Sequence, residues 1–180
     1  MKGWRWATVV ALLVLLFAAA RWGDVAERND PYWFLPSEPV VLYFAAPDAA
    51  GLVPEIRWLP VGLADAKGRL EALVEGPKNA GLFPTLPSPL RIRSVTVEGD
   101  LAVVDFDGEL VRRHPGGSAG EILTVFSVVN TLTEIPGVRR VAWRIDGRAV
   151  ETLVGHLDLS RPVERDPSLI LSPDRLRGGL

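Results

Sequence analysis

The sequence predicts an α+β domain in which two helices pack on one face of a mixed β-sheet. Three observations support this class. Residues 118–147 combine a helical pattern, a tight connection and a β-prone segment in one unbroken run. A second helical pattern lies upstream, and short β-prone segments separated by turn residues surround both helices. With 180 residues and 48% hydrophobic content, the chain is long enough for one domain with a sizeable core.

The first half of the domain should contain two strands followed by a helix. Residues 40–44 and 52–59 are β-prone, and a turn-rich loop separates them. Leucine and alanine residues then recur at helical spacing over residues 63–75, and Gly76-Pro77 ends this helix. Gly68 within the helix costs about 1 kcal/mol relative to alanine, which disfavours a helical first turn.

Residues 90–98 and 101–106 are expected to form the next two strands, joined by a hairpin turn at Gly99. Residues 107–117 should be a loop that leads to the long helix. Beyond the long helix and its strand, residues 149–154 should pair back as a hairpin, and residues 155–165 add a short extended piece. All of these elements lie within a single predicted domain.

The long helix is expected to begin at Ser118, where Ser118 and Glu121 have the spacing of a capping box. Its apolar residues recur at helical spacing and should form one core-facing stripe, consisting of Ile122, Val125, Phe126, Val129 and Leu132. Pro136-Gly137 ends the helix, because proline cannot extend it and glycine permits the turn. A strand containing Val141 and Trp143 follows, and Asp146-Gly147 is a hairpin-turn dipeptide.

Four motifs follow one another through this domain. Residues 41–60, VLYFAAPDAAGLVPEIRWLP, contain an opening strand with Tyr-Phe and then Leu-Val-Pro-Glu-x-Arg. Residues 69–87 contain a helix end with Gly-Pro and a later Leu-Pro, and residues 131–147 read TLTEIPGVRRVAWRIDG. Together they resemble the sporulation and spore-germination domain family, the GerM-type or GerMN domain, over about residues 39–165.

This resemblance implies a non-enzymatic module of the cell envelope in spore-forming bacteria and their relatives. It also implies a helix-on-sheet form similar to the ring-building modules of envelope complexes. Many members of the family carry a lipid-modified N-terminal cysteine, and this chain has no cysteine at all. Disulfides, thiolate catalysis and cysteine-based zinc sites are excluded for the same reason.

The N-terminal residues 1–22 are predicted to be a membrane anchor or signal segment. Residues 7–20 are apolar, and Lys2 and Arg5 precede them, which orients the following domain out of the cytoplasm. From Trp4 to Trp22 a helix would span ~28 Å at ~1.5 Å per residue, enough to cross the hydrocarbon core. The alternative is a signal peptide cleaved after the small residues at 18–20, which would leave a secreted domain.

The remaining boundaries follow from composition. Residues 23–39 are predicted to be a linker, whose aromatic segment 32–35 packs on the domain or lies near the membrane surface, or else docks a partner. Residues 40–165 form the domain, and residues 166–180 should be a flexible tail. Residues 23–180 contain 17 basic and 22 acidic residues, a net charge of −5 that argues against nucleic-acid binding.

The catalytic and metal-binding candidates each have a simpler structural explanation. Residues 116–120 match G-x-S-x-G, but no strand leads directly into Ser118, which is expected to serve as a helix cap. Asp105, Asp107 and Glu109 could bind a cation only with further ligands, and solvated carboxylates are the preferred interpretation. His114 and His156 are expected to be surface histidines. We therefore expect no catalytic residue, no metal and no cofactor.

Arginines supply the candidate partner-binding site. Arg91 and Arg93 are two residues apart in one predicted strand, so their side chains should share a face, and Arg144 lies on the strand after the long helix. Arg139 and Arg140 precede Arg144 in that segment. If the two strands are neighbours, these arginines form a cationic patch that faces away from the helices and suits an acidic partner or an anionic wall polymer. Ordinary solvated positions on the sheet are the alternative.

The sequence thus predicts a membrane-tethered interaction or assembly module outside the cytoplasm, linked to sporulation or germination. Its partners would be envelope or membrane-complex proteins, including further copies of itself. The alternative is a domain that binds a small ligand or cell-wall glycan, for which a groove with exposed aromatic residues is expected. An assembly module should instead present a flat sheet face or an exposed edge strand.

Overall fold

The computed structural model describes residues 35–172, and the domain begins with a two-stranded antiparallel sheet. Strand β1 (Ser37–Ala45) pairs along its full length with β2 (Leu52–Pro60). The register places Ser37 opposite Pro60 and Ala45 opposite Leu52. Both strands were predicted, and β1 begins a few residues inside the segment expected to be a linker.

Two helices are central to the domain. After the short 3-10 turn η1 (Val61–Leu63), helix α2 (Ala66–Glu75) begins at Asp65, whose carboxylate accepts the amide of Gly68 at 2.8 Å. Gly68 is required here, because a Cβ atom would lie 1.7 Å from the carbonyl oxygen of Leu63. The residue that disfavours the helix by propensity is therefore the one that lets η1 pack against its first turn. The second long helix is α4 (Ser118–Leu132), preceded by the one-turn helix α3 (Glu109–Arg112).

A five-stranded mixed sheet completes the fold. Strand β3 (Ile92–Glu98) runs antiparallel to β4 (Leu101–Phe106), which runs parallel to β5 (Arg140–Ile145). The short strands β6 (Arg148–Ala149) and β7 (Val163–Glu164) each pair antiparallel with β5. The β3–β4 register shifts between Ile92 and Ser94, so Arg93 lies at a bulge. The turn predicted at Asp146-Gly147 is present, with positive φ at both residues.

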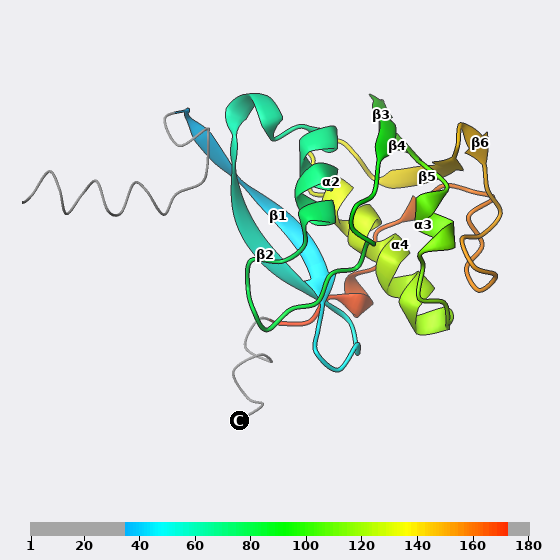
Figure 1. The fold of residues 1–180 in the computed structure, drawn as a ribbon. Coiled ribbons are helices and arrows are strands. Elements are labelled where there is room, and N and C mark those ends of the chain that lie inside the picture. The colour runs from blue at the N-terminus through cyan, green and yellow to red at the C-terminus, as the bar shows by residue number, and fades with distance from the viewer. Residues whose placement is uncertain (1–34, 173–180) are drawn as a thin grey trace, which may run out of the picture. The chain divides into compact units, whose positions relative to one another are not determined.

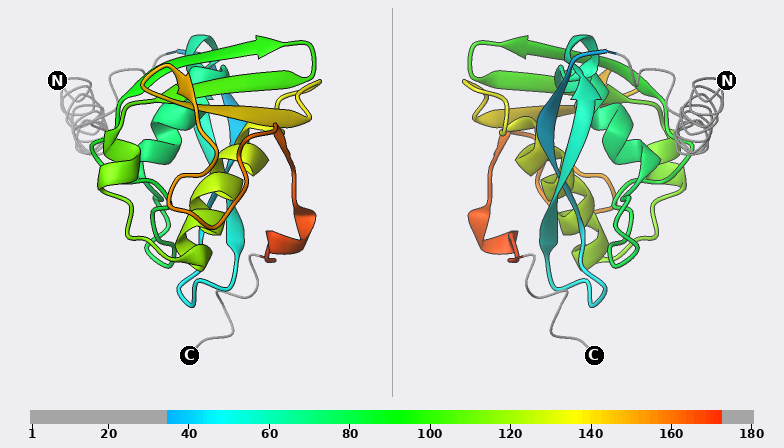
Figure 2. Two further views of the ribbon diagram at one scale, coloured as in Figure 1. Left: turned by 90° about the vertical axis from the view of Figure 1, so that its right-hand side faces the viewer. Right: turned by 90° about the vertical axis from the view of Figure 1, so that its left-hand side faces the viewer.

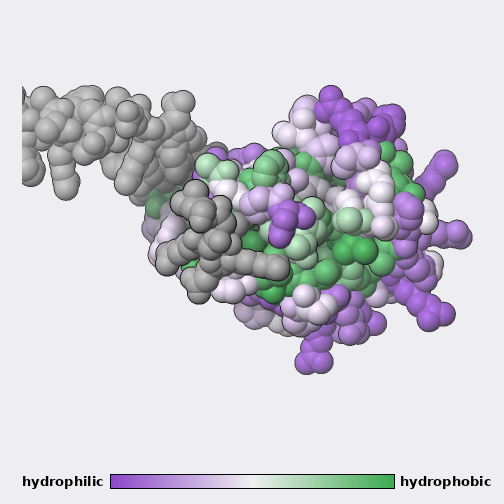
Figure 3. Space-filling model, turned by 90° about the horizontal axis from the view of Figure 1, so that it is seen from below, coloured by the Kyte–Doolittle hydropathy of each residue, from purple (hydrophilic) through white to green (hydrophobic). Residues whose placement is uncertain are grey.

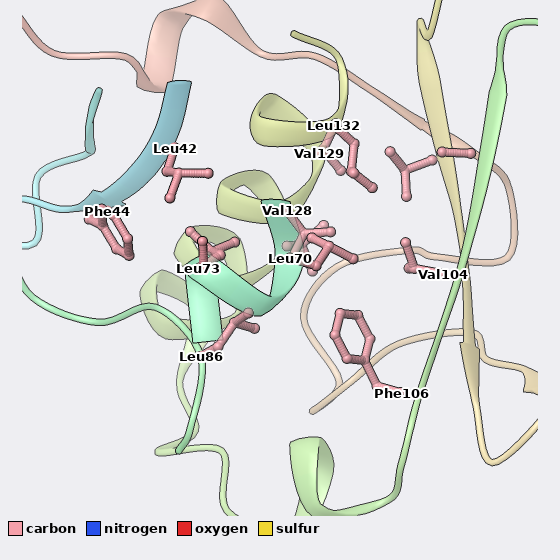
Figure 4. Packing of buried hydrophobic residues seen from close by; sticks show 14 of the residues in the cluster. Leu42, Phe44, Leu70, Leu73, Leu86, Val104, Phe106, Val128, Val129 and Leu132 are labelled. Carbon is pink, nitrogen blue, oxygen red and sulfur yellow. The ribbon is translucent and has the colours of Figure 1, made fainter. Parts of the chain in front are cut away.

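Helices α2 and α4 lie between the two sheets (Figure 1). Leu42 and Phe44 of β1 contact the helices from one side, and Val104 and Phe106 of β4 contact them from the other (Figure 4). The α+β class and the mixed sheet with helices on one face are confirmed. The prediction did not include the separate sheet formed by β1 and β2. Because both sheets contact the helices, one continuous core extends through all three layers.

Helix α4 differs from its predicted form because it is covered on more than one side. Its buried residues include Leu123, Val128 and the polar Ser127 and Asn130, which lie outside the predicted stripe. Phe126, expected at the centre of that stripe, is only partly buried. A helix enclosed between two layers must be buried around most of its circumference. A single amphipathic stripe was therefore the wrong description of this helix.

The predicted capping box is also wrong. Gly117 is the N-cap residue of α4, and no side chain forms a capping hydrogen bond there. Glu121 is fully buried and points to the loop after β6, not back to the helix start. Its carboxylate accepts the Thr152 hydroxyl and three backbone amides, those of Leu153, Val154 and His156, at 2.6 to 3.0 Å. The residue that was expected to cap the helix instead anchors a loop that is distant in sequence.

Part of the predicted tail packs against the domain. Asn130 of α4 and Asp166 exchange hydrogen bonds, in which each accepts from the other. After the 3-10 turn η2 (Pro167–Leu169), Ile170 forms a bridge with Leu52, and the amide of Leu171 donates to the carbonyl of Leu52 at 2.7 Å. Residues 166–171 therefore extend the domain past its predicted boundary. The predicted anchor at residues 1–22 lies outside the described residues, and within residues 35–172 no helix has the length and apolar character of a membrane span.

Candidate interaction surfaces

The side of the five-stranded sheet that faces away from the helices is its outer face. Ala102, Val104 and Trp143 point toward the helices and are buried, so the residues that alternate with them point outward. In the view that faces this sheet, no helix lies in front of β3, β4 or β5 (Figure 2, left). The outer face carries neutral side chains between its arginines, including Ser94, Thr96, Val103 and Ala142.

Arg93 lies on the outer face and is paired with carboxylates of the domain itself. Its Nε donates to Asp105 at 3.2 Å, and its Nη1 lies 3.7 Å from Asp146. Asp105 is buried and also accepts the amide of Gly147 at 2.9 Å. Arg93 therefore helps to hold the β5–β6 turn against β4, and much of its charge is compensated within the domain.

Arg144 lies on the same face and has no such compensation. Its Cα is opposite that of Asp105 in the parallel β4–β5 pair, and its side chain is exposed. Within the described part of the chain, no hydrogen bond or ion pair engages its guanidinium. Arg140 in the same strand pairs with Asp100 at 3.1 Å. Arg144 is therefore the arginine on this face whose donors remain available to a partner.

Arg91 lies just before β3, and its carbonyl accepts the amide of Asp107 at 3.1 Å. It lies next to Pro89 and Leu90 between two shallow hollows of about 480 and 400 Å³. The first is also lined by Glu71 and Glu75 of α2, and the second by charged side chains of the α3 region. Arg93 is the extra residue of the bulge, between Ile92 opposite Phe106 and Ser94 opposite Asp105. The structure thus places Arg93 and Arg144 on either side of Asp105 on the outer face, and Arg91 beside the two hollows.

A second polar cluster joins β1 to the end of α4 and to the chain after β7. The hydroxyl of Tyr43 donates to Glu134 at 2.6 Å and accepts from Arg165, whose guanidinium also lies over the Tyr43 ring. Arg165 pairs with Glu134 at 2.6 Å. Burial and the hydrogen bond to Glu134 raise the pKa of Tyr43 to about 12. Because all three polar groups are engaged with one another, we assign this cluster a structural role.

The catalytic candidates have no suitable partners among the described residues. His114 accepts the amide of Gly116 through Nδ1 at 3.0 Å, and its Nε2 lies 3.1 Å from the Thr124 hydroxyl. That hydroxyl donates to the carbonyl of Thr85, so Nε2 must donate to it, which requires the neutral ring. Burial lowers the pKa of His114, in agreement with this tautomer. Both ring nitrogens are therefore occupied, and neither can act as a base for Ser118.

The three carboxylates that were considered as cation ligands each have a different partner. Asp105 binds Arg93, Asp107 accepts the amide of Glu109, and Glu109 pairs with Arg112 and Arg113. Within residues 35–172, no cluster of three or more acidic or histidine side chains could hold a metal ion. The surface features of the domain are therefore its arginines and its exposed apolar residues.

Apolar side chains reach the surface on more than one side. Seen from below, the molecule shows a hydrophobic area bordered by hydrophilic residues (Figure 3). The most exposed large apolar residues are on β2, where Ile56 is 67% and Trp58 is 66% exposed. These two residues were not among the predicted surface sites, although charged and apolar residues alternate from Glu55 to Trp58 in the sequence.

Comparison with known families decides the classification of the chain. A family model described as sporulation and spore germination, named Germane, matches residues 41–151. The chain belongs to the Germane family. The predicted resemblance to the GerM-type domain is confirmed. The link of this domain type to sporulation and germination is confirmed as well. None of the curated proteins matches the chain.

Solved structures share the Germane fold. The first GerMN domain of the sporulation protein GerM from Bacillus subtilis has a TM-score of 0.61 at 26% identity, over 71% of this chain and 98% of that one. The structure of the tandem GerMN domains of the same protein has a TM-score of 0.60 at 21% identity. The match covers 76% of this chain and 47% of that one. A predicted lipoprotein from Clostridium perfringens has a TM-score of 0.53 at 22% identity. The match covers 75% of this chain and 93% of that one. This chain therefore corresponds to about half of the tandem protein.

Proposed function

We propose that this Germane-family chain is an interaction module of the cell envelope, held at the membrane by its N-terminal segment and facing away from the cytoplasm. Its task would be to bind an envelope protein, or further copies of itself, during sporulation or germination. Family membership supports the biological setting. The relative from Clostridium perfringens, a predicted lipoprotein, supports attachment to a membrane. In this cysteine-free chain, the apolar residues 7–20 would provide the attachment.

The observation that carries the proposal is the open outer face of the five-stranded sheet. The core lies on the helix side of this sheet, whereas the other side is polar and presents Arg144 without a partner. A flat face of this kind suits docking to another protein surface. The net charge of residues 23–180 is −5, so a cationic position on this face would orient an acidic partner.

The glycan-binding alternative receives less support. The two hollows beside Arg91 are shallow, and none of the residues that line them is aromatic. Sugar rings are commonly held against aromatic faces, which these hollows do not offer. We also propose that the chain acts without catalysis, in keeping with the engagement of both His114 nitrogens.

Photocross-linking from the outer face tests this function. A photoreactive amino acid at Thr96 places the probe on β3, and one at Lys78 serves as an exposed control on another side of the domain. In sporulating cells that express the full chain, Thr96 should give a discrete adduct in the membrane fraction, and Lys78 should not. Adding Arg144→Glu should abolish the adduct. Equal cross-linking from both positions, or an adduct insensitive to Arg144→Glu, would contradict the proposal.

A further inference from the structure

The β1–β2 hairpin has an inverted distribution of polarity. In β2 the charged residues Glu55 and Arg57 are partly buried, whereas Ile56 and Trp58, which alternate with them, are about two-thirds exposed. An antiparallel sheet with one solvated face normally turns its polar residues outward. Here the outward positions are apolar, so water is an unfavourable environment for this side of the hairpin.

The inversion has an identifiable cause. Glu55 pairs with Arg57 and accepts the amides of Lys78 and Asn79 at 3.0 and 2.9 Å. Arg57 also donates to the carbonyl of Gly76 at 3.0 Å. These two charges thus hold the loop after α2, which requires them to face inward. The outward positions are not needed for that task, and yet they carry large apolar residues.

The exposed apolar surface extends across both strands. We define the hairpin face as Pro39 and Val41 of β1 with Ile56 and Trp58 of β2, because Pro39 lies opposite Trp58 and Val41 opposite Ile56. Directly after β2, η1 adds Val61 and Leu63, which are 57% and 41% exposed. None of these side chains is charged. In the view that faces the hairpin, no helix or strand of the domain lies in front of it (Figure 2, right).

We propose that the hairpin face lies on the surface of the lipid bilayer, with Trp58 at the depth of the headgroups. This inference rests on the proposed attachment through the N-terminal segment. That segment joins β1 at Ser37, opposite Pro60, so it enters the domain at the end of the hairpin where Trp58 and Val61 lie. Tryptophan favours the membrane interface, and exposed aliphatic residues favour its apolar side.

Tether length makes this contact attainable. If the membrane segment ends at Trp22, the 14 residues from 23 to 36 reach at most about 48 Å at ~3.4 Å per residue. A domain on so short a tether meets the bilayer at high local concentration, so a modest apolar surface is enough to settle on it. The outer face of the five-stranded sheet belongs to the opposite layer of the domain and would remain open to a protein partner.

Site-directed spin labelling of the full chain tests the inference. The chain contains no cysteine, so Ile56→Cys and Thr96→Cys each provide one labelling site, on the hairpin face and on the outer sheet face. The labelled proteins are reconstituted into vesicles of phosphatidylcholine and phosphatidylglycerol. Collisions of the nitroxide with oxygen and with a water-soluble nickel complex are then measured.

We expect the ratio of oxygen to nickel collisions to be several-fold higher at Ile56 than at Thr96. A Trp58→Asp change should bring the Ile56 label to the value of Thr96 while the protein still floats with the vesicles. Flotation with a nickel-accessible Ile56 label in the parent protein would overturn this inference alone. Exclusion of both reagents at Ile56 would mean that a protein surface covers the face, which also overturns it. Failure to float would refute the tether and this inference together.

Discussion

The two tryptophans of the described domain occupy opposite environments in its two sheets. Trp143 of β5 points toward the helices, is 2% exposed and stacks on Phe106 with ring centroids 5.7 Å apart. Trp58 of β2 points outward and is 66% exposed. The five-stranded sheet follows the usual rule of apolar residues inside and polar residues outside. Strand β2 reverses this rule, because its inward positions opposite the buried Val40 and Leu42 of β1 carry Arg57 and Glu55.

The difference shows that one fold can use its two sheets for two tasks. In the five-stranded sheet, burial of apolar residues stabilises the domain and leaves a polar face for recognition. In the hairpin, two buried charges position the loop after α2, and the apolar residues are displaced to the surface. The same residue type therefore contributes to folding in one sheet and, by our proposal, to membrane contact in the other.

Replacing each tryptophan by alanine should give the largest contrast. Trp143→Ala removes a fully buried ring and should lower the free energy of unfolding by about 3–5 kcal/mol. Trp58→Ala removes an exposed ring and should change it by less than about 0.5 kcal/mol. Urea denaturation of both variants measures the difference. Similar losses at the two sites would mean that the hairpin face is covered within the domain itself.

Glu121→Gln should give the next largest effect. Burial alone would raise the pKa of this carboxyl, but hydrogen bonds from Thr152 and from the amides of Val154, His156 and Leu153 outweigh it and hold the pKa below its usual range. Neutralising an acceptor of this kind should cost about 2–3 kcal/mol. Ser118→Ala is the matched control and should cost less than about 0.5 kcal/mol, because Ser118 makes no capping bond.

The pH dependence gives a second test of Glu121. Because its folded pKa is lowered, its stabilising effect is present above about pH 4.5 and is lost as the pH falls through the folded value. The stability of the parent protein should therefore fall more steeply in acid than that of Glu121→Gln. Parallel acid profiles for the two proteins would show that the carboxylate does not hold the loop.

The buried carboxylate of Glu121 marks the limit of what could be predicted from the sequence. The longer strands, the turns and the two long helices were predictable because apolar periodicity and turn residues are local signals, as in β4 and at Asp146-Gly147. The short helix α3 was predicted as a loop, and the strand predicted over residues 149–154 is only Arg148–Ala149. Glu121 has the spacing of a capping box, and no local signal reveals that its partners lie more than 30 residues away. Periodicity also identifies β1 and β2 as strands without showing that they form their own sheet.

The candidate site was predictable to a similar extent. Arg93 and Arg144 were expected to share a face if their strands were neighbours, and in the structure β4 lies between these two strands. A bulge depends on the pairing of two strands, so the extra residue at Arg93 could not be predicted from its own strand. Which arginine remains unpaired depends on Asp105, Asp146 and Asp100, whose positions only the folded chain defines.

Glu55→Gln tests the cause of the inverted polarity and should have an intermediate effect. Burial would raise the pKa of Glu55, but Arg57 and the amides of Asn79 and Lys78 outweigh it and lower the pKa. Loss of the charge should reduce stability by about 1–2 kcal/mol. Hydrogen exchange at the Lys78 and Asn79 amides should also accelerate. Glu98→Gln, at an exposed outward position of β3, is the control and should leave both quantities unchanged.

Tyr43→Phe should reduce stability less than Glu55→Gln, by about 0.5–1.5 kcal/mol, because one hydroxyl between Glu134 and Arg165 is lost. The contribution of Tyr43 is present below about pH 10 and is lost as the pH rises toward its folded pKa of about 12. The difference in stability between parent and variant should therefore shrink over this alkaline range. A constant difference from pH 8 to 12 would exclude the hydroxyl as its source.

Charge reversal at Arg144 tests most directly the proposal that the outer sheet face recognises a partner. Arg144→Glu alters an exposed, unpaired side chain, and Arg161→Glu makes the same change at an exposed loop position as control. Each variant replaces the native chain in cells carried through sporulation and germination, and viable spores are counted after germination. We predict that both variants melt like the parent protein and that only Arg144→Glu lowers the count to that of the deletion strain. A normal count with Arg144→Glu would contradict recognition through this face.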